Sequence, residues 1–264
     1  MNARSVVFDL FGGYVRDSGG EISLQDLLAL LECFDVAPDS ARVMMSRLSR
    51  EGWFEVRRQS RSSMYSPSDK GWHLLDEGLE RIMRRPAPEE WDGSWVMVTF
   101  NVPEKHRAVR TRLKTKLSWL GFGQLAPSIW ISPHARLAEA EEVLHAEPGA
   151  KYDIFEARSR GIRTDAERAA ACWPLDELDK DYRIFTSWAE ELQGKAETLR
   201  GRSALVTRIE LIHAYRKFPF RDPDLPAELL PDLWPAASAY DAFIRTFEAL
   251  GPEAKAYYDS VVSQ

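Results

Sequence analysis

The stretch DSARVMMSRLSREGWFEVRRQSRSSMY, residues 39–65, decides how the rest of this chain is interpreted. At 100° per residue, a helix that begins near residue 39 has one apolar face and one cationic face. The inward side chains are Ala41, Met44, Met45 and Leu48. The outward side chains are Ser40, Arg42, Val43, Ser46, Arg47 and Arg50. The pattern predicts an amphipathic helix whose exposed face carries three guanidinium groups.

A short hairpin is predicted directly after this helix. Residues 53–58, WFEVRR, are typical of a strand, residues 59–63 form a polar turn, and Met64 and Tyr65 begin the return strand. The hairpin carries Arg57, Arg58 and Arg61. Strand alternation directs the first two of these to opposite faces, so only one of that pair is expected to contact DNA. A cationic helix beside a cationic hairpin is typical of a winged helix-turn-helix that reads DNA.

Net charge argues against a nucleic-acid binder, whereas the local charge argues for one. The 264 residues are 44% hydrophobic and 29% charged, as in a globular protein, with a formal net charge of −6. Between residues 40 and 70, however, seven residues are basic and three are acidic, which gives a local excess of four positive charges. An acidic protein can therefore still present a basic surface to DNA.

The sequence lacks the usual signatures of catalysis, metal binding and membrane insertion. The two cysteines, Cys33 and Cys172, are far apart, and the five histidines show no metal-ligand spacing. No Walker A, GxSxG or CxxC motif occurs, and no apolar run is long enough to span a membrane. We therefore expect a cytoplasmic protein that is not an enzyme and holds no metal or cofactor.

The residues before and after the opening stretch complete a first domain. Residues 22–34 are rich in leucine and predict a helix that Ser23 caps. After a turn over residues 35–39, Asp39 or Ser40 is expected to cap the next helix, which Gly52 ends. A further helix, expected to pack through Trp72, Leu75, Leu79, Ile82 and Met83, leads to a proline-containing linker at residues 84–90.

The remaining chain predicts two further domains. Strands are expected at 94–100, within 124–132 and at 152–157, and helices at 105–120 and 135–145, an order typical of a ferredoxin-like unit. Beyond residue 161 the clearest segments are helical: 165–173, 175–192, 203–218 and 236–250. The predicted fold class is therefore α+β and multidomain. It comprises a winged helix-turn-helix (1–88), a central ferredoxin-like α+β domain (89–160) and an all-α C-terminal domain (161–264).

Several stretches resemble the PaaX family of repressors of phenylacetic acid catabolism. They are GGEISLQDLLALL (19–31), RLSREGWFEVRRQSRSSMYSPSDKG (47–71), EEWDGSWVMVTFNVPE (89–104), LGFGQLAPSIWISP (120–133) and LIHAYRKFPFRDPDLPAELLPDLWP (211–235). The resemblance implies a homodimeric transcriptional repressor on double-stranded operator DNA. It also implies release by an aryl-acetyl coenzyme A thioester, which is phenylacetyl-CoA for the type member.

The central domain also resembles the small ferredoxin-like nucleases of CRISPR integration, which carry an aspartate near the end of the first strand. Here that strand leads into Asn101, which argues against metal-dependent cleavage. The alternative function is a nuclease or acyl-CoA hydrolase with a helix-turn-helix appendage. It would need an acid–base pair or a metal cluster in residues 90–264, and the sequence shows neither.

Two groups of residues are candidates for binding the thioester. Arg107, Arg110 and Lys114 form a basic stripe that suits phosphate groups, although a solvated face or a second DNA contact explains it equally well. Trp130 is a candidate wall for an aryl group, or a core residue. Arg216 falls on an apolar helix face near His213 and Tyr215, where it either binds a ligand or pairs with Asp222 or Asp224.

Overall fold

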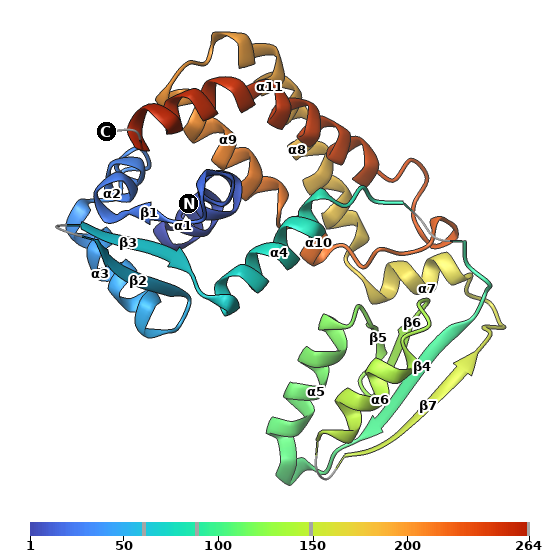
Figure 1. Cartoon of the computed structure of the whole chain (residues 1–264). Helices are drawn as coiled ribbons and strands as arrows, with labels where there is room; N and C mark the ends of the chain where they lie inside the picture. Colours follow the sequence, from blue (N-terminus) through green and yellow to red (C-terminus); the bar gives the residue numbers. More distant parts are fainter. Residues whose placement is uncertain (60–61, 88–89, 148–149, 263–264) are drawn as a thin grey trace. The chain divides into compact units, whose positions relative to one another are not determined.

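The computed structural model of the chain describes residues 1–59, 62–87, 90–147 and 150–262 (Figure 1). The chain forms two compact units, each with its own hydrophobic core. Unit 1 comprises residues 1–85, 183–219 and 238–264, and unit 2 comprises residues 86–182 and 220–237. The helix α8 (Leu175–Lys195) contributes its first residues to unit 2 and the remainder to unit 1.

Unit 1 begins with the helix α1 (Ala3–Leu10), which continues into a π-helical turn, η1 (Phe11–Val15), and a 3-10 turn, η2 (Arg16–Ser18). Four apolar side chains of this segment lie in the core of unit 1. They are Val6, Val7, Leu10 and Phe11. Gly19 ends the segment with a φ of 96°, a left-handed conformation that favours glycine.

The next elements are β1 (Ile22–Ser23), α2 (Leu24–Glu32) and α3 (Pro38–Arg50). Ser23 caps α2 as predicted, because its Oγ accepts a hydrogen bond from the Asp26 amide at 3.0 Å. The predicted cap of α3 is wrong. Ala37 occupies the N-cap position without a side-chain hydrogen bond, and Pro38, whose φ already suits a helix, starts the first turn. The helix therefore begins before Asp39 and Ser40, which leaves neither of them at the cap.

The predicted hairpin follows α3. Gly52 terminates the helix with a φ of 76°, as expected. The strands β2 (Phe54–Gln59) and β3 (Ser62–Pro67) then pair antiparallel, and β3 also pairs with β1 in a sheet of order β1-β3-β2. Arg61, a predicted contact residue, lies outside the described residues.

The helix α4 (Asp69–Met83) packs against β3 and η1. Ser68 caps it, and Leu75 is buried against η1 and β3 elements. Leu79, predicted to belong to the packing face, is 39% exposed, so that prediction is wrong. The end of α4 instead makes polar contacts with later segments: Arg81 Nε donates to the Pro219 carbonyl oxygen at 2.9 Å, and the Met83 carbonyl oxygen accepts from the Tyr240 hydroxyl at 2.7 Å.

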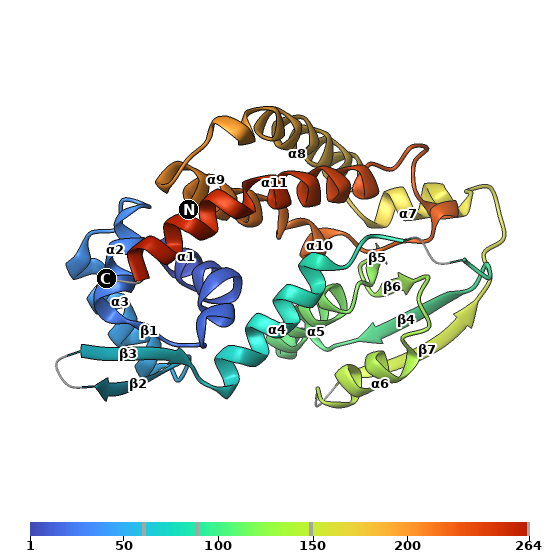
Figure 2. The same cartoon turned by 45° about the horizontal axis from the view of Figure 1, so that its top comes forward.

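Helices from the last third of the chain complete the core of unit 1. They are α9 (Arg202–Tyr215) and α11 (Ala236–Val262). Leu205 and Ile209 of α9 and Tyr258 of α11 share one buried cluster with the residues of α1 and α2. Both views show the C-terminal end of α11 beside α2, where the Cys33 sulfur lies 3.4 Å from the Tyr257 hydroxyl (Figures 1 and 2). The division into domains 1–88, 89–160 and 161–264 remains an interpretation of the sequence, since these helices share a core with the first segment.

Unit 2 has the predicted order of strands and helices. Its elements are β4 (Trp95–Asn101), α5 (Arg107–Trp119), β5 (Gly123–Ala126), β6 (Ile129–Ser132), α6 (Leu137–His145) and β7 (Lys151–Ala157). The sheet order is β5-β6-β4-β7, and each neighbouring pair is antiparallel. This is the topology of a ferredoxin-like α+β unit.

Both faces of this sheet are covered, which explains why β4 is a nearly continuous apolar run. Val96, Val98 and Phe100 face the core formed with α5 and α6, which lie on one side of the sheet (Figures 1 and 2). Trp95 belongs to a second cluster with Trp173, at the end of the helix α7 (Asp165–Cys172). Short helical turns complete the chain: η3 (Glu104–His106), η4 (Ala196–Thr198), α10 (Phe218–Arg221) and η5 (Ala227–Leu229).

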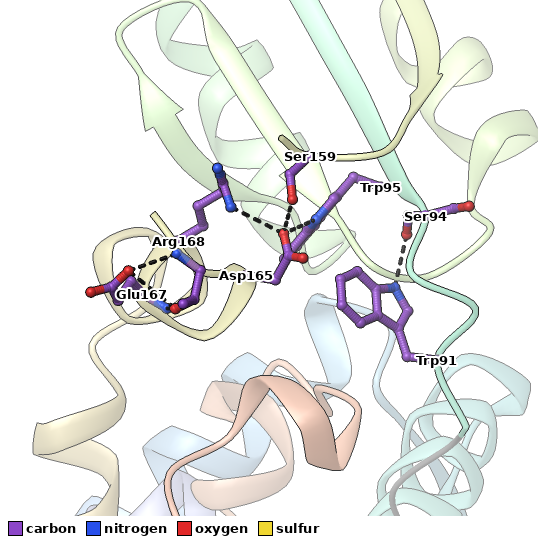
Figure 3. Close-up of polar contacts among 8 residues, drawn as sticks. Trp91, Ser94, Trp95, Ser159, Asp165, Glu167 and Arg168 are labelled. Carbon is purple, nitrogen blue, oxygen red and sulfur yellow. Dashed lines mark hydrogen bonds and ion pairs between the residues drawn. The ribbon is translucent and has the colours of Figure 1, made fainter. Parts of the chain in front are cut away.

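One carboxylate joins the start of α7 to the strand β4 (Figure 3). Asp165 Oδ1 accepts hydrogen bonds from Trp95 Nε1 at 3.0 Å, from Arg168 Nη1 at 3.2 Å and from the hydroxyl of Ser159. These contacts satisfy the indole N–H of a tryptophan that is almost wholly buried. Trp95 is therefore a core residue of unit 2.

Candidate nucleic-acid interface

The two faces of α3 are those that the sequence predicts. Ala41, Met45 and Leu48 are buried in the core of unit 1, and Met44 is half-buried. The predicted outward residues are all exposed: Ser40, Arg42, Val43, Ser46, Arg47 and Arg50. Val43 is 69% exposed, an unusual position for a branched apolar side chain. The burial pattern of the helix is thus confirmed, and its contact with DNA stays a prediction.

The three arginines of this face differ in their partners. Arg42 Nη1 donates to Asp39 Oδ1 at 2.8 Å, one turn earlier on the same helix. Arg47 Nε lies 3.6 Å from Glu51 Oε1. Arg50 has no ion-pair partner among the residues that the structure describes. All of these contacts are exposed, and exposed ion pairs are weak enough for a phosphate to displace them.

The hairpin arginines differ in the same way. Arg57 Nη2 donates to Glu21 Oε1 at 2.7 Å, whereas Arg58 is exposed and forms no ion pair within the described part of the chain. Arg57 stands opposite Met64 and Arg58 opposite Ser63, so their side chains alternate across β2 as predicted. Arg58 is the more available of the two for an external anion.

Sequence reasoning missed one arginine beside α3. Arg4 Nη1 of α1 donates to Glu51 Oε2 at 3.0 Å, and its guanidinium carbon lies 5.5 Å from the centre of a Trp53 ring. An open groove separates the start of α1 from the flank of α3. It is lined by Asn2, Ala3, Arg4, Asp39, Ser40, Val43, Met44 and Arg47. No local pattern reveals a contact between residues 47 positions apart.

The predicted basic stripe on α5 is partly occupied by internal contacts. Arg110 donates to the Val102 carbonyl oxygen at 2.7 Å and to Glu104 Oε2 at 3.2 Å. Arg107 is exposed and Lys114 half-buried, and neither has an ion pair among the described residues. Arg110 therefore fixes the start of its own helix, which leaves Arg107 and Lys114 as the available cations of the stripe.

The effector candidates are divided between the two units, and the stripe on α5 belongs to unit 2. Trp130 belongs to unit 2 and is 4% exposed in the core between the sheet and α5. His213, Tyr215 and Arg216 belong to unit 1. Tyr215 is fully buried and stacks on Phe243, with ring centres 4.2 Å apart. Trp130 and Tyr215 thus act as core residues, and their role in binding an effector remains a prediction.

Arg216 is paired as the structural interpretation expected, but with a different carboxylate. Its Nη1 donates to Asp9 Oδ1 at 2.6 Å, within unit 1. Asp222 instead accepts hydrogen bonds from the Tyr182 hydroxyl and the Asp224 amide, both at 2.8 Å. The expected pairing of Arg216 with the 222–224 loop is therefore wrong, because its guanidinium is paired with the buried carboxylate of α1.

Burial shifts the titration of this cluster. It raises the pKa of Asp9 to about 7, although Arg216 opposes the shift. Burial also lowers the pKa of His213 to about 4, and the nearby Arg216 adds to that effect. His213 is consequently neutral at physiological pH, and its Nδ1 accepts a hydrogen bond from Arg216 Nη2 at 2.9 Å. Arg216 thus links α9 to α1.

Three other features were sought in the described part of the chain: a metal site, a reactive thiol and a membrane-spanning helix. No group of three or more His, Cys, Asp or Glu side chains is arranged there to hold a metal ion. Burial raises the pKa of Cys172 to about 11, so this thiol is a poor nucleophile. Among the described residues, no helix combines the length and the apolar character needed to cross a bilayer.

Three models of known protein families match this chain. Residues 2–71 match the family described as PaaX-like protein, residues 88–169 match the PaaX protein central Cas2-like domain, and residues 173–260 match the PaaX-like protein C-terminal domain. These matches cover most of the sequence. The chain therefore belongs to the PaaX family.

Individual relatives agree with this assignment. The chain is 34% identical over 266 aligned positions to the transcriptional repressor PaaX of Escherichia coli strain K12, an alignment that covers 97% of this chain and 83% of that protein. The structure is similar to that of the uncharacterised protein Rv0674 from Mycobacterium tuberculosis, with a TM-score of 0.61 and 23% identity. That likeness covers 97% of this chain and 98% of the other, and it concerns the fold alone.

Proposed function

We propose that this protein is a transcriptional repressor that binds operator DNA through a winged helix-turn-helix formed by α2, α3 and the β2–β3 hairpin. The observation that carries the proposal is the outward face of α3. It presents exposed arginines, hydroxyl groups and an exposed valine. In a major groove, such groups contact guanine edges, phosphates and thymine methyl groups. The repressor name of the Escherichia coli relative supports the same function.

The mechanism couples DNA binding to a small molecule. A homodimer presents two copies of α3 to the half-sites of a pseudo-palindromic operator, in the cytoplasm and in control of phenylacetate degradation. An acyl-CoA such as phenylacetyl-CoA releases it, which requires the ligand to bind the released arrangement more tightly than the DNA-bound one. Domains 1–88, 89–160 and 161–264 divide these tasks. Membership of the PaaX family supports each part of this proposal.

One titration tests the proposal against an enzymatic function. The purified protein is added to the DNA upstream of its own gene, with and without phenylacetyl-CoA, while thioester and DNA cleavage are followed. A repressor binds the DNA tightly and releases it when the thioester is added. It cleaves neither the DNA nor the thioester. Turnover without DNA binding would instead identify a hydrolase or nuclease.

A matched variant makes the titration specific to α3. Arg50→Ala removes an exposed guanidinium without breaking an ion pair among the described residues, so the fold should be unaffected. Arg245→Ala, which removes an exposed arginine from α11, is the control. Operator binding should weaken for the first variant only. Equal binding by both variants would mean that the face of α3 is not the reading surface.

A further inference from the structure

The groove between α1 and α3 adds a second element to the candidate interface. Arg4 stands on the α1 side of the groove, and Arg47 and Ser40 stand on the α3 side. On the helical wheel, Arg47 and Ser40 occupy the flank of α3 that faces α1, and Arg42 occupies the opposite flank. The groove therefore continues the outward face of α3 and is not a separate site.

The charged groups at this groove, counted with their ion-pair partners, leave a positive surplus. Asp39, which also lines the groove, is paired with Arg42 at 2.8 Å, so it does not neutralise the other two arginines. Glu51 is shared between two arginines, with Oε2 3.0 Å from Arg4 Nη1 and Oε1 3.6 Å from Arg47 Nε. One carboxylate cannot neutralise two guanidinium groups, so the trio carries a net charge of about +1. All three side chains are more than a third exposed, and so an anion can reach them.

The position of Arg4 is held by packing as well as by charge. Its guanidinium carbon lies 5.5 Å from a Trp53 ring centre and 5.7 Å from the Phe8 ring centre. Cation–π contacts of this kind orient a guanidinium at modest energy. Arg4 is thus presented at the groove in a defined place, with one edge of its fork on Glu51.

The dimensions of DNA indicate what occupies the groove. A major groove is about 12 Å wide, and an α-helix with its side chains is about 10–12 Å across. A duplex that receives α3 therefore brings its sugar–phosphate backbone directly past the flanks of that helix. On the α1 flank, the backbone meets the positive trio.

From this geometry we propose that Arg4 binds a phosphate of the DNA strand that borders α3, and that Glu51 moderates this contact. The proposal rests on the proposed function and extends the interface from α3 to α1. Because phosphates carry no base identity, Arg4 contributes to binding of any sequence. Glu51 positions Arg4 and Arg47 and also repels the phosphate, so it limits non-specific affinity.

Two variants with opposite expected signs test the proposal on a labelled random-sequence duplex, followed by fluorescence anisotropy over a range of salt concentrations. Arg4→Gln should weaken binding about fivefold and lower the salt slope by about one, since one phosphate contact is lost. Glu51→Gln should strengthen binding and steepen the slope, because the surplus charge grows. Arg245→Gln, an exposed paired arginine on α11, should leave both quantities unchanged.

The outcomes separate this proposal from the one it rests on. If the wild-type protein binds DNA and Arg50→Ala weakens it while Arg4→Gln does not, the extension to α1 is wrong and the repressor function stands. If Arg4→Gln and Glu51→Gln both weaken binding and lower the melting temperature, Arg4 is a structural brace only. If the wild-type protein binds no duplex at all, the proposed function itself fails.

Discussion

Arg216, the residue that caps the C-terminal end of α9, donates to Asp9 of α1 over 2.6 Å, and this contact joins segments 207 positions apart. Asp9 is buried, and its second carboxylate oxygen, Oδ2, has no hydrogen-bond partner among the described residues. A buried charge is tolerated only when it is paired, so Arg216 supports the ionised form of Asp9. The contact therefore makes the stability of unit 1 sensitive to pH.

Removing the cation should expose that sensitivity. Arg216→Met leaves Asp9 buried without its partner and should lower the free energy of unfolding by about 3–5 kcal/mol at pH 8. The loss should shrink under acidic conditions, because a protonated Asp9 no longer needs a cation. Urea unfolding at both pH values measures the difference. A loss independent of pH would show that Arg216 acts through packing alone.

Two residues of the same cluster, Asp9 and His213, should change the free energy of unfolding with pH in opposite directions. The raised pKa of Asp9, about 7, contributes stability that is present below pH 3.8 and is lost as pH rises through 7. The lowered pKa of His213, about 4, contributes stability that is present above pH 6.5 and is lost as pH falls through 4. Between pH 4 and 6.5 the two contributions therefore oppose one another in the wild-type protein.

The variant His213→Gln should therefore show the pH dependence of stability that is due to Asp9 alone. Its free energy of unfolding should decrease as pH rises from 4 to 7, by at most about 1.4 kcal/mol per pH unit. Denaturant titrations at several pH values within this window provide the measurement, with the wild-type protein as the reference. An increase of stability with pH in this variant would show that Asp9 is already ionised at low pH.

Two glycines of α4 provide a matched test of packing. A Cβ on Gly71 would lie 2.4 Å from the Trp53 carbonyl oxygen, whereas a Cβ on Gly78 would meet no heavy atom within 4 Å. Gly78→Ala should stabilise the protein by about 1 kcal/mol through helix propensity. Gly71→Ala should destabilise it by about 1–3 kcal/mol, because the steric clash outweighs the same gain. Thermal melting of the two variants decides this, and shifts of the same sign would contradict it.

In unit 2, a buried carboxylate holds two cations of α5. Glu147, 5% exposed, lies 2.8 Å from Arg112 Nη2 and 2.9 Å from Lys116 Nζ, and the hydrogen bond from Arg112 is the main cause of its pKa of about 2. A lowered pKa contributes stability that is present above pH 4.5 and is lost as pH falls through 2. Glu147→Gln should thus melt at a lower temperature than the wild-type protein at neutral pH. The gap should narrow on acidification, and a constant gap would contradict the ion-pair explanation.

Local patterns predicted much of this molecule, and distant contacts account for what they missed. The period of α3 identified its buried Ala41 and exposed Arg50, because a helix face depends only on neighbouring residues. The partner of Arg216 was assigned to the nearest acids in the sequence, whereas the true partner comes from the first helix. Arg4 was overlooked for the same reason, since only the fold brings it to Glu51.

The two arginines of β2, Arg57 and Arg58, should contribute unequally to DNA binding. Arg58 has no ion pair among the described residues, whereas Arg57 must first leave Glu21, which lies 2.7 Å away. Arg58→Ala should therefore weaken operator binding by about 1 kcal/mol or more, and Arg57→Ala should weaken it less. Anisotropy titrations of the operator and of a scrambled duplex distinguish base reading from phosphate contact. If Arg57→Ala has the larger effect, the Glu21 pair does not persist in the complex, and the opposite face of β2 meets the DNA.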